Sequence, residues 1–380
     1  MNRFLQTSFL LLTYFFVFAQ TSNDFYLLAG TYTSGKSEGI YVYQFNSITG
    51  ESKLISSVIA SNPSFLTVSP DEKFVYAVYE NADSTRFTVT GFVASFSFDK
   101  KNGKLSFINK QESGGKHPCY VAIDKTGKWV FAGNYSSGSV AVLPVNADGS
   151  LGIAKQTMQH KGSSVVKGRQ EEPHVHSTVI SNDNKTLYVP DLGIDKVMIY
   201  KFDNKTGKLS EADIPFSASK PGAGPRHFDI HPNGKFAYLM EELTGSVSVY
   251  QVLKNGGLNL LQNISALPRD FTGIIGSADI HVSPDGKFLY CSNRGGSNTI
   301  GILKIDENTG LLNWVGSQST LGKTPRNFNF DPTGNFLLVA NQNSDEIVIF
   351  KRNIETGSLT DTGKRISVPN PVCIKWISTK

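Results

Sequence analysis

The sequence is poor in the residues that make disulfide frameworks and thiolate metal sites. Its 380 residues include three cysteines, Cys119, Cys291 and Cys373, each inside an apolar, strand-like run. Three unclustered cysteines argue against both kinds of site, so we expect buried free thiols. The net charge of +5 comes without a long basic run, which argues against nucleic acid as a partner.

Helix-forming signals are also scarce. Methionine occurs four times, whereas aromatic and β-branched residues and glycine are plentiful. This composition favours strands and tight turns over helices. We find no glycine-rich loop of the kind that cradles phosphates in nucleotide-binding proteins, so a nucleotide-dependent role is not expected.

The N-terminus carries the pattern of a secretory signal peptide. Arg3 supplies the positive charge, Phe9 to Phe18 form an apolar stretch, and cleavage after Ala19 satisfies the small-residue rule. The stretch is too short to span a membrane comfortably, and no second apolar segment follows it. We therefore expect residues 1–19 to be removed and residues 20–380 to form a single exported domain, periplasmic or extracellular, without a membrane span.

One pattern recurs along the remaining chain: a Pro/Asp/Gly turn followed by an alternating aromatic and aliphatic run. The copies begin at Ser69, Asp124, Ser181, His231, Ser283 and Asp331. A second, independent pattern of Thr/Asn/Asp-Gly turns between two strand-like runs occurs seven times, at Thr49, Asn102, Asp148, Thr206, Asn255, Thr309 and Thr356. A tight turn between such runs is typical of a hairpin, so seven turns predict seven hairpins.

A repeat of roughly 50 residues has room for four short strands, as in a propeller blade. The first hairpin lacks an innermost strand of its own, and 371–377 match the inner-strand pattern of 118–123. The sequence thus predicts an all-β, seven-bladed β-propeller whose ring is closed by the C-terminal strand joining the N-terminal strands. Closure would remove the free sheet edges of an open stack.

Function should come from departures from the repeat. Five residues before each repeat turn lies one register of the innermost strand, with Ser64, Cys119, His176, Arg226, Ala278, Arg326 and Val372. Eleven residues after the turn start lies a second register, with Tyr32, Glu80, Tyr135, Leu192, Glu242, Arg294 and Gln342. In a propeller the first register borders the central axis. We select His176, Arg226, Glu242 and Arg294 as candidate catalytic residues.

These four residues allow two interpretations. They could form a structural salt-bridge cluster that fills the axis, since arginine pairs well with carboxylates. The excess of arginine over carboxylate instead indicates a concave site with spare positive charge, which suits a small anionic ligand. No acidic cluster of the kind that holds Ca²⁺ occurs in these registers, so no metal or other cofactor is expected.

Three segments carry a resemblance to a known family. They read GTYTSGKSEGIYVYQF, PHVHSTVISNDNKTLYVPDL and GAGPRHFDIHPNGKFAYLMEEL. They resemble the lactonase family of seven-bladed propellers, which includes propeller-type 6-phosphogluconolactonases and fungal carboxy-muconate lactonising enzymes. In the lactonising relatives the site is a His, a Glu and two Arg, and the matching residues here are His176, Glu242, Arg226 and Arg294.

The resemblance implies metal-independent hydrolysis of a sugar lactone at the central channel. His176 suits the base that deprotonates water, and Glu242 could orient it or act as a second acid/base. Arg326, His174 and His227 are expected substrate contacts, although His174 could simply line the channel mouth. Two alternatives stay open: a non-catalytic exported scaffold with a protein partner, and a muconate-type lactonising cycloisomerase.

Overall fold

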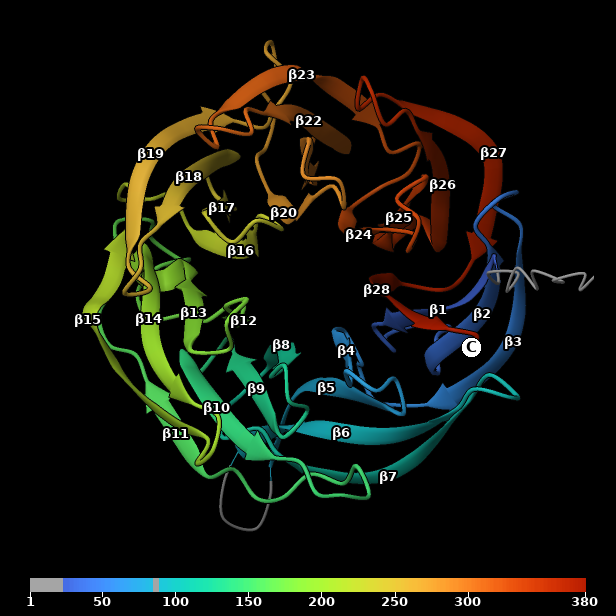
Figure 1. The fold of residues 1–380 in the computed structure, drawn as a ribbon, viewed down its shortest axis with the longest axis horizontal. Coiled ribbons are helices and arrows are strands. Elements are labelled where there is room, and N and C mark those ends of the chain that lie inside the picture. Colours follow the sequence, from blue (N-terminus) through green and yellow to red (C-terminus); the bar gives the residue numbers. More distant parts are fainter. Residues whose placement is uncertain (1–22, 85–88) are drawn as a thin grey trace, which may run out of the picture.

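The computed structural model describes residues 23–84 and 89–380, which form seven four-stranded antiparallel sheets around one axis (Figure 1). The seven-bladed β-propeller predicted from the two turn patterns is confirmed. The predicted leader, residues 1–19, lies outside the described residues. Among the described residues, no helix is long and apolar enough to cross a membrane.

Each blade runs from a strand beside the axis to a strand at the rim. The innermost strands are β28 (Pro371–Ser378), β4 (Leu66–Val68), β8 (Pro118–Ile123), β12 (Val179–Ile180), β16 (Pro225–Ile230), β20 (Ser277–Val282) and β24 (Pro325–Phe330). The second strands are β1 (Asp24–Thr31), β5 (Phe74–Ser84), β9 (Trp129–Asn134), β13 (Thr186–Asp191), β17 (Phe236–Glu241), β21 (Phe288–Asn293) and β25 (Phe336–Asn341).

The outer half of each blade is a hairpin. Its first strands are β2 (Gly39–Asn46), β6 (Val89–Asp99), β10 (Ser139–Pro144), β14 (Lys196–Asp203), β18 (Ser246–Val252), β22 (Thr299–Ile305) and β26 (Glu346–Arg352). The rim strands are β3 (Ser52–Ile59), β7 (Lys104–Glu112), β11 (Gln156–Gln159), β15 (Lys208–Ala218), β19 (Leu258–Ser265), β23 (Leu312–Ser319) and β27 (Leu359–Ser367). Two 3₁₀ turns, η1 (Leu192–Ile194) and η2 (Gln342–Ser344), follow β13 and β25.

Burial follows position in the blade. Strands β9, β13, β17, β21 and β25 are buried at every residue, because neighbouring sheets cover both of their faces. Rim strands such as β23 alternate between covered and exposed residues, as expected for a sheet edge wetted on one side. The apolar core therefore lies between the blades.

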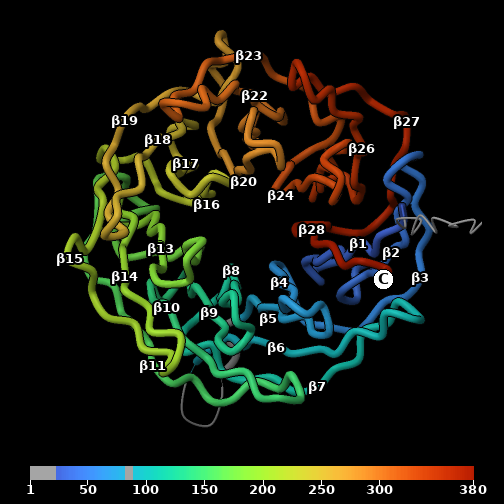
Figure 2. The backbone as a smooth tube through the Cα atoms, in the orientation of Figure 1, coloured from blue at the N-terminus to red at the C-terminus, as the bar shows by residue number. Residues whose placement is uncertain are grey.

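The ring closes where the two ends of the chain meet. Strand β28 pairs antiparallel with β1, from Phe25 opposite Ser378 to Thr31 opposite Pro371. The sheet order β28-β1-β2-β3 thus joins C-terminal and N-terminal strands in one blade. Figure 2 shows the red C-terminal tube beside the blue strand β1.

The seven hairpin turns also connect neighbouring blades. Their central glycines all have a left-handed backbone, with φ between 61° and 82°, which glycine adopts most readily: Gly50, Gly103, Gly149, Gly207, Gly256, Gly310 and Gly357. Four of their carbonyls accept a hydrogen bond from a tyrosine hydroxyl of an adjacent blade, in the pairs Tyr76–Gly149, Tyr188–Gly256, Tyr238–Gly310 and Tyr290–Gly357. Each such pair ties a hairpin to the next sheet.

Truncation of the chain before Pro371 should destabilise the fold severely. It removes β28, exposes the edge of β1 and opens the ring, so we expect the melting temperature to fall by at least about 10 °C. Differential scanning calorimetry on the purified protein measures this. A shorter truncation before Thr379, outside β28, is the matched control and should cost much less. Equal melting temperatures for the full and truncated chains would contradict closure by β28.

Candidate active site

A cavity of about 300 Å³ lies at the axis, where all seven blades meet. Each blade, or the connection that leads into it, contributes at least one lining residue: Tyr32, Glu80, Cys119, Tyr135, Arg169, His176, Glu242, Arg294 and Arg326. Only the axis of a closed ring can collect side chains from so many blades. Three of the four candidate catalytic residues, His176, Glu242 and Arg294, therefore share one cavity.

Irregularities in the innermost strands orient two of these side chains, Cys119 and Arg326, and also that of Arg226. The pairing register shifts at Pro118/Tyr120 in β8, at Pro225/His227 in β16 and at Pro325/Asn327 in β24. The extra residue at each shift is Cys119, Arg226 and Arg326, respectively. A bulge of this kind turns one side chain away from the regular alternation of the strand. These are the positions of the first sequence register.

Glu242 is the centre of the charged cluster. It directly follows β17, and its Oε2 accepts a hydrogen bond from Arg226 Nε at 2.7 Å. The same oxygen lies 3.2 Å from Arg294 Nη2, while Oε1 accepts from Arg169 Nη2 at 2.7 Å. Burial alone would raise the pKa of Glu242, but Arg294 and Arg226, with Arg169, outweigh it and lower that pKa to about 2. Glu242 is therefore a permanent carboxylate at neutral pH.

Arg226 acts from behind this carboxylate. Its side chain is 1% exposed, and it does not line the cavity. Its Nη1 atom is buried without a hydrogen-bond partner among the described residues. Removing Arg226 would take away a positive charge that offsets the burial of the Glu242 carboxylate. This residue therefore holds Glu242 in place.

His176 lies beside Glu242 in the cavity. Its Nε2 lies 4.0 Å from Glu242 Oε2, and its Nδ1 lies 3.7 Å from Cys119 Sγ. The ring of Tyr135 packs edge-on against it at 5.4 Å. Burial, followed by the charges of Arg226, His227 and Arg326, lowers the pKa of His176 well below its ordinary value. The imidazole is thus neutral and able to accept a proton.

Arg294 and Arg326 also line the cavity. Arg294 is anchored by main-chain carbonyls, with Nε 2.9 Å from Gly276 O and Nη2 3.1 Å from Ser277 O. The guanidinium of Arg326 stacks over the ring of Tyr32 at 5.3 Å. The Tyr32 hydroxyl donates to Glu80 Oε2 at 2.8 Å. These groups are fixed by protein contacts before any ligand enters.

The other two predicted contacts lie outside this cavity. His174 stacks on Tyr135 with ring centroids 4.4 Å apart, and its Nδ1 donates to Tyr135 O at 3.1 Å. His227 donates from Nδ1 to Asp279 Oδ1 at 2.7 Å. His227 lines a separate cavity of about 90 Å³, and its ring contacts that of His176 at a centroid distance of 5.4 Å.

Sequence reasoning missed Arg169 entirely. This residue lies in the connection from β11 to β12, which has no counterpart in the repeat and so falls outside both registers. The unusual length of that connection was the available signal. The registers did contain Tyr32, Glu80, Cys119 and Tyr135, but nothing in the sequence separated them from scaffold.

Within the described ranges, no group of three or more His, Cys, Asp or Glu side chains is arranged to hold a metal ion. The carboxylates of the cavity are instead occupied by protein donors. Glu242 is paired with arginines, and Glu80 accepts from Tyr32 and from Ser64. The donor set suits anions rather than cations.

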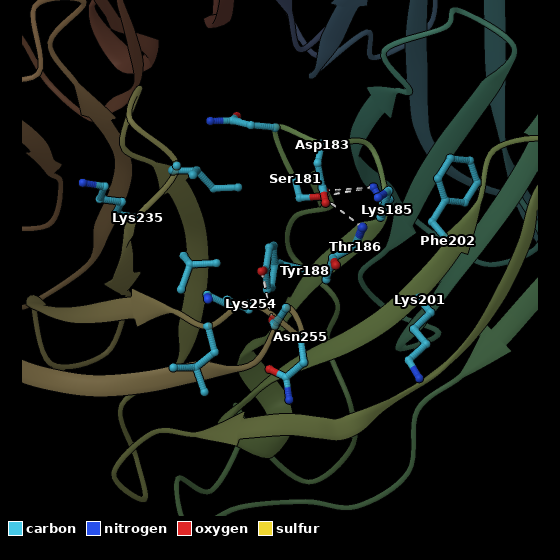
Figure 3. Close-up of a pocket in the computed structure, with 16 residues that line it drawn as sticks. Ser181, Asp183, Lys185, Thr186, Tyr188, Lys201, Phe202, Lys235, Lys254 and Asn255 are labelled. Carbon is cyan, nitrogen blue, oxygen red and sulfur yellow. Dashed lines mark hydrogen bonds between the residues drawn. The ribbon is translucent and has the colours of Figure 1, made fainter.

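A larger hollow elsewhere belongs to the scaffold. A groove of about 710 Å³ lies between two neighbouring blades. Figure 3 shows Tyr188, Lys201 and Lys254 among the residues that line it. It contains the Tyr188–Gly256 hydrogen bond. A second groove of about 510 Å³, with Phe74 and Trp129, occupies the corresponding place between another pair of blades. Repetition around the ring marks these grooves as a consequence of blade packing.

Comparison with known proteins agrees with this geometry. The model of a family described as "Lactonase, 7-bladed beta-propeller" matches residues 26–376. The chain belongs to this lactonase family. The family that the sequence resembles is therefore confirmed.

Several relatives within this family are similar over nearly their whole length. A 6-phosphogluconolactonase of Formosa agariphila is 42% identical over 339 residues, which cover 88% of this chain and 94% of the relative. A 6-phosphogluconolactonase of Bacillus subtilis is 38% identical over 352 residues, or 92% and 97% of the two chains. The solved periplasmic gluconolactonase of Pseudomonas aeruginosa has a TM-score of 0.89 and 39% identity, covering 94% of this chain and 100% of its own.

Proposed function

We propose that this protein is a metal-independent lactonase that opens a sugar lactone by hydrolysis, in the manner of a 6-phosphogluconolactonase, with His176 as the base. The observation that carries this proposal is a neutral, buried imidazole facing an arginine-lined cavity in a member of the lactonase family. The names of the relatives, 6-phosphogluconolactonase and gluconolactonase, supply the substrate class.

His176 performs the first proton transfer. A water molecule between its Nε2 and the lactone carbonyl loses a proton to the imidazole as its oxygen attacks the carbonyl carbon. The depressed pKa of His176 keeps the imidazole neutral at neutral pH, and the tautomer with the proton on Nδ1 leaves Nε2 as the acceptor. When the tetrahedral intermediate collapses, the ring C–O bond breaks and the imidazolium returns its proton to the leaving oxygen. The products are a carboxylic acid and a free hydroxyl.

The arginines stabilise the charge that develops on the carbonyl oxygen. Arg294 and Arg326 line the same cavity as His176 and are held by Gly276, Ser277 and Tyr32. Donors that are fixed in advance spend no reorganisation energy as the oxyanion forms. Glu242, with its pKa of about 2, serves to space and orient the arginines rather than to donate a proton.

A lactone panel tests the activity. We expect the purified protein to release acid from a six-membered sugar lactone, with and without a 6-phosphate, in a pH-stat or indicator assay. Prior treatment with EDTA should leave the rate unchanged, because the cavity offers arginines where a metal site needs free carboxylates. Loss of activity with EDTA would refute metal independence. Absence of turnover on every lactone would favour a binding scaffold, and net ring closure of a muconate would favour a cycloisomerase.

Substitution of the base should separate catalysis from stability. His176→Ala should lower kcat by about 100-fold or more, since positioned acid–base groups contribute that much. In the wild type, kcat/KM should stay constant as pH falls to 6.5 and decrease only below it, because protonation of His176 requires a more acidic solution than ordinary histidine does.

The matched control is His117→Asn, since asparagine tolerates the left-handed backbone of His117 (φ 49°), which lies outside the cavity. It should retain wild-type kcat. If His176→Ala lowers the melting temperature but keeps kcat per folded molecule, the charged cluster is structural and the catalytic assignment is wrong.

We also propose that the protein is exported. The support is the signal-peptide pattern of residues 1–19 and the similar solved protein described as periplasmic. A mature chain would then begin at Gln20.

Intact-mass spectrometry on protein purified from its native host tests export. We expect the mass of residues 20–380 and recovery from the periplasmic or extracellular fraction. A cytoplasmic protein that retains residues 1–19 would contradict the proposal.

A further inference from the structure

The connection between β11 and β12 places a fifth charged residue in the site. It carries Arg169 to the cavity, where Nη2 donates to Glu242 Oε1 at 2.7 Å. Unlike the other arginines, Arg169 does not come from the blade repeat. Arg169 is therefore an addition to the repeat that lies in the central cavity.

This connection is fixed firmly on either side of Arg169. The neighbouring Gln170 is fully buried and donates from Nε2 to Leu192 O at 2.8 Å. Ser164 Oγ donates to Asp195 Oδ2 at 2.5 Å. At Gly193 of η1, a Cβ atom would lie 1.9 Å from Glu172 O, so the two segments touch too closely for any other residue. Arg169 is therefore presented by a well-anchored segment.

Arg169 is also the accessible arginine of the cluster around Glu242. Its side chain is 41% exposed, against 16% for Arg294 and 1% for Arg226. Arg294 spends donors on two main-chain carbonyls, and Arg226 is buried behind the carboxylate. A guanidinium has five N–H donors, and Arg169 directs some of them to Glu242 and Tyr135. Donors remain to face a ligand at the mouth of the cavity.

The charge balance indicates which ligand group those donors would meet. Arg169, Arg294 and Arg326 line the cavity with Glu80 and Glu242, and Arg226 adds a further positive charge behind it. With His176 neutral, positive charge is in excess. Guanidinium groups bind phosphate and carboxylate in a bidentate manner. An anionic substituent that enters with the lactone is thus best accommodated at the exposed edge.

We propose that Arg169 is a specificity residue that binds an anionic substituent of the lactone substrate, a phosphate or a carboxylate, at the mouth of the cavity. The proposal rests on the lactonase function proposed above. It assigns separate roles: His176, Arg294 and Arg326 act on the carbonyl, while Arg169 selects charged lactones over neutral ones.

Selectivity measurements on Arg169→Gln test this assignment. The ratio of kcat/KM for 6-phosphogluconolactone to that for gluconolactone should fall by about 10- to 100-fold, mainly through KM for the phosphorylated lactone. Arg169→Lys should restore only part of the ratio, because an ammonium group lacks the two parallel N–H donors with which a guanidinium binds an anion. Lys167→Ala, on the same connection and of the same charge, is the matched control and should keep the wild-type ratio.

A binding experiment provides a readout that does not depend on turnover. Isothermal titration of the His176→Ala protein with 6-phosphogluconate, glucarate and gluconate compares a phosphate, a second carboxylate and a hydroxyl at the same end of the sugar acid. We expect Arg169→Gln in this background to weaken binding of whichever acid, 6-phosphogluconate or glucarate, binds more tightly than gluconate, which also identifies the anionic group that Arg169 binds.

Two results would overturn the proposal. An unchanged selectivity ratio in Arg169→Gln would mean that Arg169 does not bind the anionic substituent of the substrate. Equal weakening of all three sugar acids means that Arg169 only supports Glu242. A wild-type protein that hydrolyses no lactone would refute the proposed function, while the titrations would still decide whether Arg169 reads the anionic group.

Discussion

The hydrogen bonds between β28 and β1 are the constraint on which the rest of the molecule depends. Each second strand is buried on both faces, so every blade needs a neighbour on either side, and a chain with two ends can supply them all only by closing on itself. Closure also creates the axis. The cavity exists because seven blades, including the one shared by both ends of the chain, direct residues to one place.

The chemistry of that place follows from an unequal arrangement of charge. Glu242 is surrounded by Arg169, Arg226 and Arg294, and it stays ionised despite burial because their charges outweigh desolvation. The same positive field, together with burial, keeps His176 neutral. One electrostatic environment thus has two effects: it keeps Glu242 ionised, and it keeps the imidazole of His176 neutral and able to accept a proton. This is why the site suits attack on a carbonyl group, whose oxygen becomes negatively charged as the nucleophile adds.

Much of the fold could be read from local sequence. The seven turn glycines require a left-handed backbone, a property of the residue itself, and the strand runs between them have a period of two. Counting from the separate Pro/Asp/Gly repeat turns also located Arg226, Arg326, Glu242 and Arg294, because a repeat places equivalent residues at equivalent depths. Counting could not locate Arg169, which lies in a connection outside the repeat, nor show that Arg226 supports Glu242 from behind.

The sequence by itself determined the strand and turn pattern, the number of blades and the registers that face the axis, because these depend on residues close together in the chain. It also carried the three segments by which the lactonase family is recognised. Only the tertiary structure decided which members of those registers share a cavity. It separated His176 from His227 and His174, and it brought Arg169 to Glu242, 73 positions away in the chain. Those outcomes depend on bulges, burial and long-range charge, which arise only once the ring is closed.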